Sequence, residues 1–485
     1  MTKRGLGGLF AVNSFGSAAT ILVLLITVPI YVRQIGDARY GVLSIVWLLV
    51  GYFGFLDFGL SRASTNALAR LGDGSAVERS RVVMTSFALN VAFGLVGSAV
   101  LYFAGTFLLA KIIAVPSDLV REVAASLPWM AALLPLALVS GVAVGTLEAR
   151  ERFVAANTLQ VVGTIVGQVV PVVCAVHFGP DLSIVIPATV LARAAGVALM
   201  IGYVLLYNGP WPSIRIDPRI ARGLLGYGGW VTISGLVNPI LQSIDQMVIG
   251  SLLGVASVTY YAIPMNLVIR SQLFASALSR TLFPRMSRLE EAESRLLSER
   301  ALVTLAFGYA AICAPAIVVI KPFLALWIGP AFGEAGGRVA EVLMLGTWIN
   351  GLALIPYNLL QAQGRPDVVA KLHLLEALPY LAVLFLLTSH YGVVGAAVAW
   401  SMRVALDAGL LSWTARLDRS VVIRMAPAAA SLAAAFLLAV SNPLPFWPAM
   451  AAATVIGLAV VGLALVFDPQ ARAILLKGRA TFRRA

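Results

Sequence analysis

The sequence predicts an all-α integral membrane protein of about fourteen transmembrane helices, arranged as two six-helix lobes and a C-terminal helix pair. Three observations support this fold class. The 485 residues are 60% hydrophobic and 12% charged, whereas a soluble domain is about half apolar and a quarter charged. Apolar segments of about 20 residues, the length that crosses a bilayer, follow one another with short turns between them. Short phrases of the first half recur in the second half in the same order.

The predicted transmembrane segments are approximate at their ends, because the pattern locates a span better than its boundary. They cover residues 9–32, 40–61, 83–109, 123–147, 155–178, 183–206, 226–252, 258–283, 301–321, 339–361, 371–389, 392–413, 424–440 and 446–467.

The basic residues predict which side of the membrane each turn faces. They concentrate in every second turn, beginning with Lys3 and Arg4 and ending in a tail that holds Arg483 and Arg484. Because basic turns stay in the cytoplasm, both termini are expected there. The net charge of +13 is therefore a topology signal that faces anionic lipid, and nucleic acid is not an expected partner.

An internal repeat connects the two halves of the chain. LSRASTNALARL (60–71) is followed 218 residues later by LSRTLFPRMSRL (278–289), and Arg152 and His177 recur as Arg365 and His390. Both copies start on the cytoplasmic side, which predicts a parallel repeat about an axis along the membrane normal. The expected domains are residues 1–210, 211–420 and a final helix pair with a basic tail at 421–485.

A duplicated helical unit in a membrane is typical of a secondary transporter that opens its site to one side and then the other. The turns are short, and the sequence contains no Gly-rich phosphate loop, no His cluster with metal spacing and no nucleophile elbow. An enzyme, a cofactor and a metal site are therefore not expected, and a channel is disfavoured. Cys174 and Cys313 lie in apolar runs, so no disulfide framework is expected.

Four stretches of the chain stand out as a group: RQIGDARYGVLSIV (33–46), LDFGLSRASTNALAR (56–70), GYGGWVTISGLVNPILQSIDQMVIGSLLGVASVTYYAI (226–263) and QGRPDVVAKLHLLEALPYLAVLFLLTSHYGVVGAAVAW (363–400). In this order they resemble the polysaccharide-transport branch of the MOP superfamily, the Wzx-like flippases. The resemblance extends over almost the whole chain.

The resemblance implies two lobes that form an inverted V around a central cavity in the bacterial cytoplasmic membrane. It implies a flippase that moves polyprenyl-pyrophosphate-linked oligosaccharide units to the outer leaflet by alternating access coupled to an ion. Membrane lipids and the polysaccharide polymerase and export machinery are the implied partners. Three alternatives remain: a drug or cation antiporter, a lipid II flippase and, from a different class, a membrane glycan polymerase or ligase.

Arginines within the predicted spans are the first candidates for binding a pyrophosphate, because a guanidinium makes bidentate contacts with phosphate and is costly in hydrocarbon. Arg270 lies near the middle of its span, on a helix that lines the cavity in the family, and is the favoured residue. Arg193 and Arg403 are repeat equivalents with either a cavity role or a structural role. Asp407, four residues after Arg403, is a candidate partner for a local ion pair.

Polar residues of span seven form a second candidate group. Asn238, Gln242 and Asp245 fall on one helical stripe. Asn238 and Gln242 are predicted to bind substrate, while Asp245 is a candidate for ion coupling or for a structural contact.

The remaining candidates lie elsewhere in the spans. Arg62 and Arg280 of the repeated phrase are predicted to meet the arriving pyrophosphate at the cytoplasmic mouth. Asp57 has a capping or a gating role, and Glu376 with His373 is a candidate proton relay.

Overall fold

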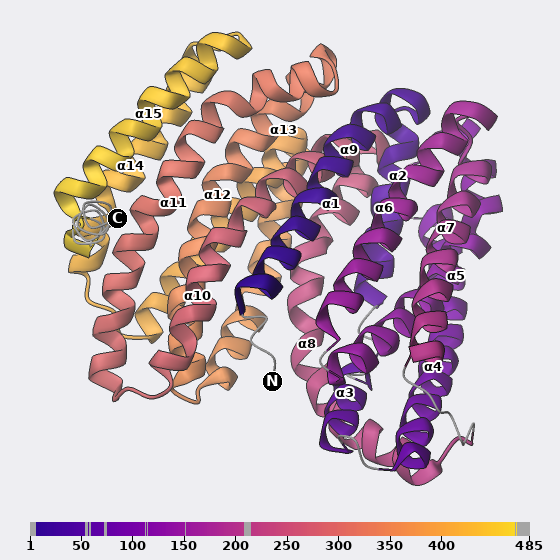
Figure 1. The fold of residues 1–485 in the computed structure, drawn as a ribbon. Coiled ribbons are helices and arrows are strands. Elements are labelled where there is room, and N and C mark those ends of the chain that lie inside the picture. Colours follow the sequence, from indigo (N-terminus) through magenta and orange to yellow (C-terminus); the bar gives the residue numbers. More distant parts are fainter. Residues whose placement is uncertain are drawn as a thin grey trace. The chain divides into compact units, whose positions relative to one another are not determined.

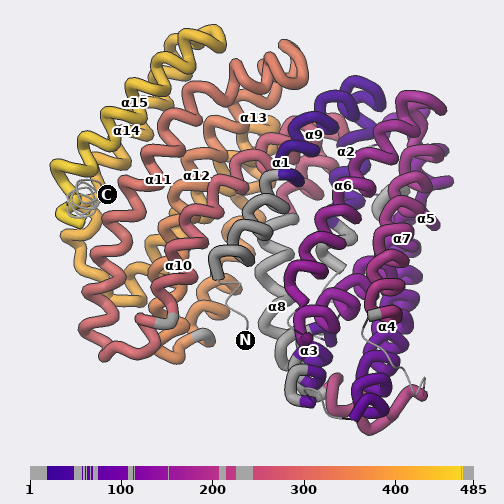
Figure 2. Tube along the Cα trace, viewed as in Figure 1, coloured from indigo at the N-terminus to yellow at the C-terminus, as the bar shows by residue number. Residues whose placement is uncertain are grey.

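The computed structural model describes residues 6–53, 57, 60–71, 75–111, 113, 115–150, 152–207, 215–470 and 472 (Figure 2). Every regular element in these ranges is a helix. Nine of the described helices are long and apolar enough to cross a membrane. The prediction of an all-helical membrane protein is therefore confirmed, and the total of about fourteen spans stays a prediction.

The chain packs as two units that divide between Val258 and Thr259. Unit 1 is the part before this point, and unit 2 is the part after it. The division describes packing, and the predicted domains 1–210, 211–420 and 421–485 stay predictions.

Unit 1 is built around α5, which packs against α2, α3, α4 and α7, while α6 packs against α1 and α7 (Figure 1). Apolar spans without internal polar runs favour long helices, and most of these helices have the predicted centres. In chain order they are α1 (Leu6–Ile35), α2 (Asp37–Phe53), α3 (Leu60–Leu71), α4 (Ala76–Lys111), α5 (Ser117–Ala149), α6 (Phe153–Phe178), α7 (Leu182–Tyr207) and α8 (Pro218–Leu253).

One arginine joins the starts of three helices in unit 1. The Arg39 guanidinium on α2 donates to both carboxylate oxygens of Glu122 on α5, at 2.9 and 2.6 Å. Glu122 also accepts the backbone N–H of Leu182, the first residue of α7, at 3.0 Å. The bidentate pair thus holds α7 in register with α5.

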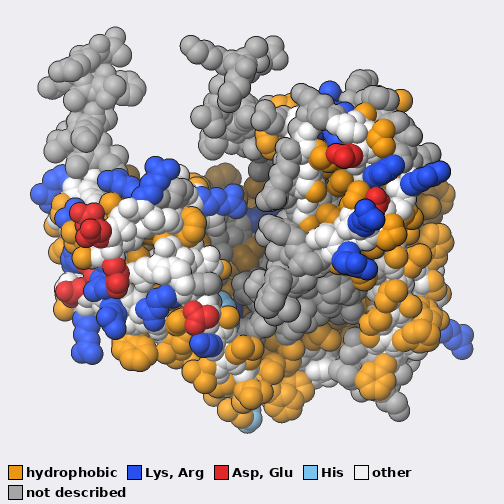
Figure 3. Space-filling view, turned by 90° about the horizontal axis from the view of Figure 1, so that it is seen from below, with side chains coloured by type: hydrophobic (Ala, Val, Ile, Leu, Met, Phe, Trp, Pro, Cys, Tyr) orange, Lys and Arg blue, Asp and Glu red, His pale blue; other side chains and the backbone are white. Residues whose placement is uncertain are grey.

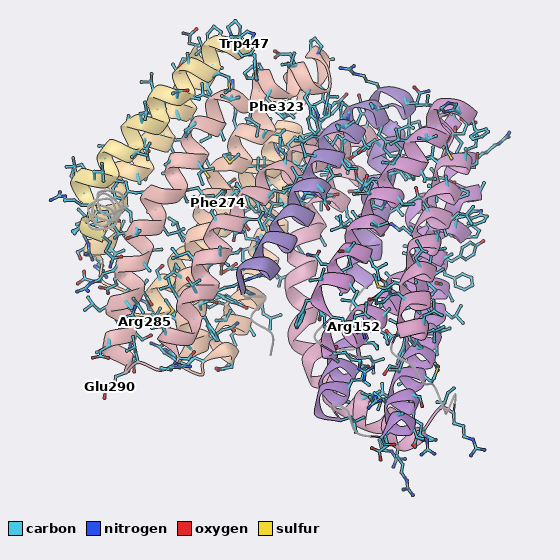
Figure 4. All side chains as sticks on the ribbon, in the orientation of Figure 1. Arg152, Phe274, Arg285, Glu290, Phe323 and Trp447 are labelled. Carbon is cyan, nitrogen blue, oxygen red and sulfur yellow. The ribbon has the colours of Figure 1, made fainter. Side chains whose placement is uncertain are left out.

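Unit 2 is built around α11, which packs against α10, α12, α14 and α15, and α12 in turn packs against α13. Arg285 and Glu290 lie at one end of this unit, and Phe323 and Trp447 lie at the opposite end (Figure 4). Aromatic side chains favour a membrane interface, so their position agrees with helices that cross the bilayer. The elements are α9 (Val255–Val268), which crosses the division, η2 (Ile269–Gln272), α10 (Leu273–Met286), α11 (Glu291–Trp327), α12 (Pro330–Ala362), α13 (Pro366–Thr414), α14 (Ser420–Ser441) and α15 (Phe446–Phe467).

Two predicted spans are not single regular helices. The range 40–61 contains α2 and the beginning of α3, and the range 258–283 contains the 3₁₀ turn η2 between α9 and α10. Conversely, α13 runs through two predicted spans, because it consists of two helices joined at Gly392 with φ +61° and ψ −144°. Glycine adopts a positive φ without a Cβ clash, so it allows the chain to turn there.

The repeated Leu-Ser-Arg phrase makes comparable contacts in the two units. In unit 1, a Cβ on Gly141 of α5 would lie 2.7 Å from Ser61 Oγ. In unit 2, Asn358 of α12 donates to Ser279 Oγ, and Ser279 Oγ donates to the backbone oxygen of Leu354 at 3.5 Å. Since α5 and α12 correspond to predicted spans four and ten, each serine packs on the equivalent helix of its own copy. Packing between neighbouring helices therefore gives one reason for the repeated phrase.

The contact between α4 and α5 sets a strict size limit at Gly94. A Cβ on Gly94 would lie 2.6 Å from the Cα of Pro135, so Gly94→Ala forces two helix backbones apart. We expect a loss of about 1–3 kcal/mol of stability, measured as a lower melting temperature of the detergent-solubilised protein. Gly308→Ala is the matched control, since no atom lies within 4 Å of the added Cβ. Equal melting temperatures for the two variants would contradict this packing.

Candidate functional site

A polar pocket opens on the surface of unit 1, among helices that are otherwise apolar. Its volume is about 440 Å³. Its polar lining comes from four helices: Thr20 of α1, Ser140 of α5, Asn157, Gln160 and Thr164 of α6, and Arg193 of α7. The three α6 residues stand at i, i+3 and i+7, which places them on one side of the helix. Such a stripe within a membrane span faces water or a polar ligand.

Arg193 supplies the positive charge of this pocket. The pocket lining contains no carboxylate, and among the described residues Arg193 makes no ion pair within 4.0 Å. Arg193 is partly buried. An intramembrane guanidinium without a protein carboxylate is suited to a ligand that brings negative charge or hydroxyl oxygens.

Glycines allow α6 and α7 to approach closely beside the pocket. A Cβ on Gly196 of α7 would lie 3.1 Å from the Cα of Gly163, and a Cβ on Gly167 would lie 3.5 Å from Arg193 Cγ. The stem of Arg193 therefore lies along α6, next to the helix that carries the polar stripe. The sequence predicted Arg193 as an intramembrane cation but not its polar neighbours, which the spacing of Asn157, Gln160 and Thr164 could have indicated.

The favoured sequence candidate, Arg270, lies in unit 2 in the 3₁₀ turn η2. Its side chain is partly exposed, and in the described chain it makes no ion pair within 4.0 Å. The neighbouring Ser271 hydroxyl forms a hydrogen bond with Tyr309 OH of α11 at 2.7 Å. This bond anchors the turn, and a 3₁₀ turn within a long helix often marks a functional site or a hinge.

The other predicted binding residues are described in part. Arg280 is exposed on α10. The side chains of Arg62, Asn238 and Gln242 lie outside the described part of the structure.

Two predicted gating or coupling acids have local partners. Asp57 accepts the backbone N–H of Ser61 at 3.1 Å and its hydroxyl at 2.8 Å, as expected of the capping role at the start of α3. Asp245 is fully buried on α8 and accepts the backbone N–H of Gln246 at 2.8 Å.

A second group of charged residues lies inside unit 2, between the two halves of α13. Glu376, Arg403 and Asp407 are 2%, 9% and 8% exposed. The anticipated local pair between Arg403 and Asp407 does not form. Instead, the Arg403 guanidinium carbon lies 5.3 Å from the centre of the Tyr380 ring, and His373 Nε2 lies 3.5 Å from Asp407 Oδ1.

The fold around Gly392 explains this arrangement. Arg403 and Asp407 follow the turn at Gly392, while His373, Glu376 and Tyr380 precede it, so antiparallel halves bring them together. The spacing of Arg403 and Asp407 in the sequence shows only that they are neighbours within one helix. Counting residues outward from Gly392 would have predicted that Glu376 and Asp407 lie at the same depth.

The described residues contain no group of three or more His, Cys, Asp or Glu side chains that could hold a metal ion.

Comparison with known proteins places the chain in a family. The polysaccharide biosynthesis protein family model matches residues 10–290. A Shigella flexneri protein named "Putative O-antigen transporter" is 27% identical over 407 residues, which are 83% of this chain and 95% of that protein.

Solved structures support the same type of fold. The lipid II flippase MurJ in an inward closed conformation superposes with a TM-score of 0.75 at 14% identity, covering 94% of this chain and 98% of that chain. An inward-facing multidrug resistance MATE family transporter of the MOP superfamily superposes with a TM-score of 0.70 at 16% identity, covering 84% and 95%. The expectation that the chain is not an enzyme is confirmed by the Shigella flexneri transporter relative, and the resemblance that the motifs indicated is confirmed by the family match. The chain therefore belongs to the polysaccharide biosynthesis protein family and is a multi-pass membrane transporter with a MurJ- and MATE-like fold.

Proposed function

We propose that this protein is a flippase that moves polyprenyl-pyrophosphate-linked oligosaccharide units from the cytoplasmic to the outer leaflet for surface polysaccharide synthesis. The observation that carries the proposal is the Arg193 pocket, defined by Thr20, Ser140, Asn157, Gln160, Thr164 and Arg193. A guanidinium surrounded by amides and hydroxyls, with no carboxylate in the lining, matches a cargo that combines an anion with sugar hydroxyls.

The proposed setting is the bacterial cytoplasmic membrane, with both termini in the cytoplasm. Arg285 and Glu290 lie at one end of unit 2 (Figure 4), and Lys and Arg side chains gather on the surface of unit 2 that is seen from that end (Figure 3). A basic face supports a cytoplasmic side, because basic residues resist translocation and are attracted to anionic lipid. Two six-helix lobes in parallel repeat, working by alternating access, are part of this proposal.

Arg193 and Arg270 have different roles in the proposed mechanism. Arg193 holds the charged or hydroxyl-rich part of the cargo within unit 1. Arg270, at the irregular turn η2 of unit 2, is a separate proposed contact for an anionic group of the cargo. Arg62, Arg280, Asn238 and Gln242 remain proposed contacts along the route.

Export in a strain that lacks this gene tests the function. The strain is expected to accumulate lipid-linked repeat units on the cytoplasmic face, and a plasmid copy of the gene is expected to restore the surface polysaccharide. The same plasmid is introduced into a strain depleted of its lipid II flippase. Rescue of the second strain without rescue of the first would contradict the proposal and would identify a lipid II flippase instead.

A further inference from the structure

The buried charged residues of α13 form a cluster that lies outside the Arg193 pocket and has no part in the proposed binding of cargo. This charge cluster consists of His373, Glu376 and Tyr380 from the first half of α13 and Arg403 and Asp407 from the second half. His373 and Glu376 stand one helical turn apart on the first half of α13, and His373 Nε2 lies 3.5 Å from Asp407 Oδ1 of the second half, which places Glu376 close to Asp407. All of these residues belong to unit 2.

The two carboxylates of the cluster lack enough hydrogen-bond donors among the described residues to stabilise two negative charges. Neither carboxylate oxygen of Glu376 has a hydrogen-bond donor among the described residues, and Oδ1 of Asp407 has none either. The Arg403 guanidinium lies by the Tyr380 ring, and its Nε also lacks a partner in the described chain. Two adjacent buried carboxylates cannot both keep their charge cheaply, and one proton shared between them removes a charge and supplies the missing donor.

The other charged residues described on the packed helices do not neutralise the negative charge of Glu376 and Asp407. Among the described helices, α12 makes the extensive contact with α13. Tyr357 is the titratable residue of α12 that packs on the neighbouring apolar cluster, which includes Ala408 and Leu411. The acids of α12 have partners elsewhere. Glu334 pairs with Lys321, and Glu341 pairs with Arg338.

The cluster favours a proton over a metal cation. Hard cations require several oxygen ligands, and a guanidinium inside the site repels a second positive ion. A proton needs one carboxylate oxygen. His373 has 14% of its side chain exposed and lies 3.5 Å from Asp407 Oδ1, so it provides a step between the surface and the buried pair.

We propose that the Glu376–Asp407 pair is the proton-binding site that couples a proton gradient to export. This inference rests on the proposed flippase function. A proton from water, passed through His373, forms one O–H bond on a carboxyl of the pair. The same bond breaks when the proton leaves to the other side, and the charge of the cluster changes by one.

Infrared spectroscopy of the purified protein tests the site without any transport assay. The wild type at neutral pH is expected to show the carbonyl band of a buried protonated carboxyl group, and Glu376→Gln and Asp407→Asn are each expected to remove it. Glu341→Gln is the matched control, since Glu341 is 1% exposed but forms an ion pair with Arg338 at 2.7 Å; this variant is expected to keep the band. A wild-type band that survives both substitutions in the cluster, or no band in the wild type, would overturn the proton site.

Flipping in proteoliposomes tests the coupling. An inward pH gradient is expected to accelerate flipping by the wild type and by Glu341→Gln, whereas Glu376→Gln is expected to lose this acceleration. A wild-type protein that responds to a sodium gradient and ignores a pH gradient would overturn the proposal. If the infrared band is present but the wild type moves no lipid-linked glycan, the proposed function fails and the proton site stands.

Discussion

Replacement of Arg193 by alanine is expected to reduce glycan export by about 10- to 100-fold, because hydrogen bonds to a charged group contribute about 1.5–3 kcal/mol. Arg193 is the only charged residue that lines the described pocket, so no neighbouring cation can replace it there. Arg193→Lys is expected to keep part of the activity, since the charge remains while the bidentate geometry is lost. Surface polysaccharide and cytoplasmic lipid-linked repeat units are measured together with the amount of protein in the membrane.

Arg300→Ala is the control for this prediction, because Arg300 is exposed at the start of α11 and lies outside the pocket. It is expected to export normally. Normal export by a well-expressed Arg193→Ala variant would exclude the pocket from the transport route.

Replacement of Arg270 by alanine is expected to reduce export to a similar degree, about 10- to 100-fold, if this cation also contacts the pyrophosphate. Arg270→Lys should recover part of the export. The same assays of polysaccharide, accumulated repeat units and protein level apply.

Ser271→Ala separates binding from positioning at this turn. It removes the hydrogen bond to Tyr309 at 2.7 Å and leaves the guanidinium in place, so a smaller reduction than that of Arg270→Ala is expected. An effect of Ser271→Ala as large as that of Arg270→Ala would show that the turn matters rather than the charge.

The spans were predictable from the sequence because bilayer thickness fixes the length of an apolar segment. The predicted segments 155–178 and 183–206 closely match α6 and α7. The break within 258–283 was not predictable, since the turn Ile269–Gln272 contains neither proline nor glycine. Its 3₁₀ turn is fixed in part by the Ser271–Tyr309 contact, which joins residues 38 positions apart.

The charged residues of the two sites were predictable from the sequence, but which residues pack around each of them was not. Arg193 and Arg403 were recognisable from composition alone, because arginine is rare within membrane spans. Their different environments depend on tertiary packing. The glycines at 163 and 196 bring Arg193 beside the α6 stripe, whereas the turn at Gly392 places Arg403 near Tyr380. Helix periodicity could have indicated the polar stripe of α6, but not that Arg193 packs beside it or that Arg403 lies near Tyr380.

Purified protein in proteoliposomes with a polyprenyl-pyrophosphate-linked oligosaccharide tests the central claim most directly. A membrane-impermeant glycosidase outside the vesicles measures how much of the glycan crosses from the inner leaflet. The wild type is expected to expose the inner-leaflet glycan to the enzyme with time, and Arg193→Ala is expected to leave it protected. If the glycan in vesicles that contain folded wild-type protein stays as resistant to the glycosidase as the glycan in protein-free vesicles, the assignment as a flippase is contradicted.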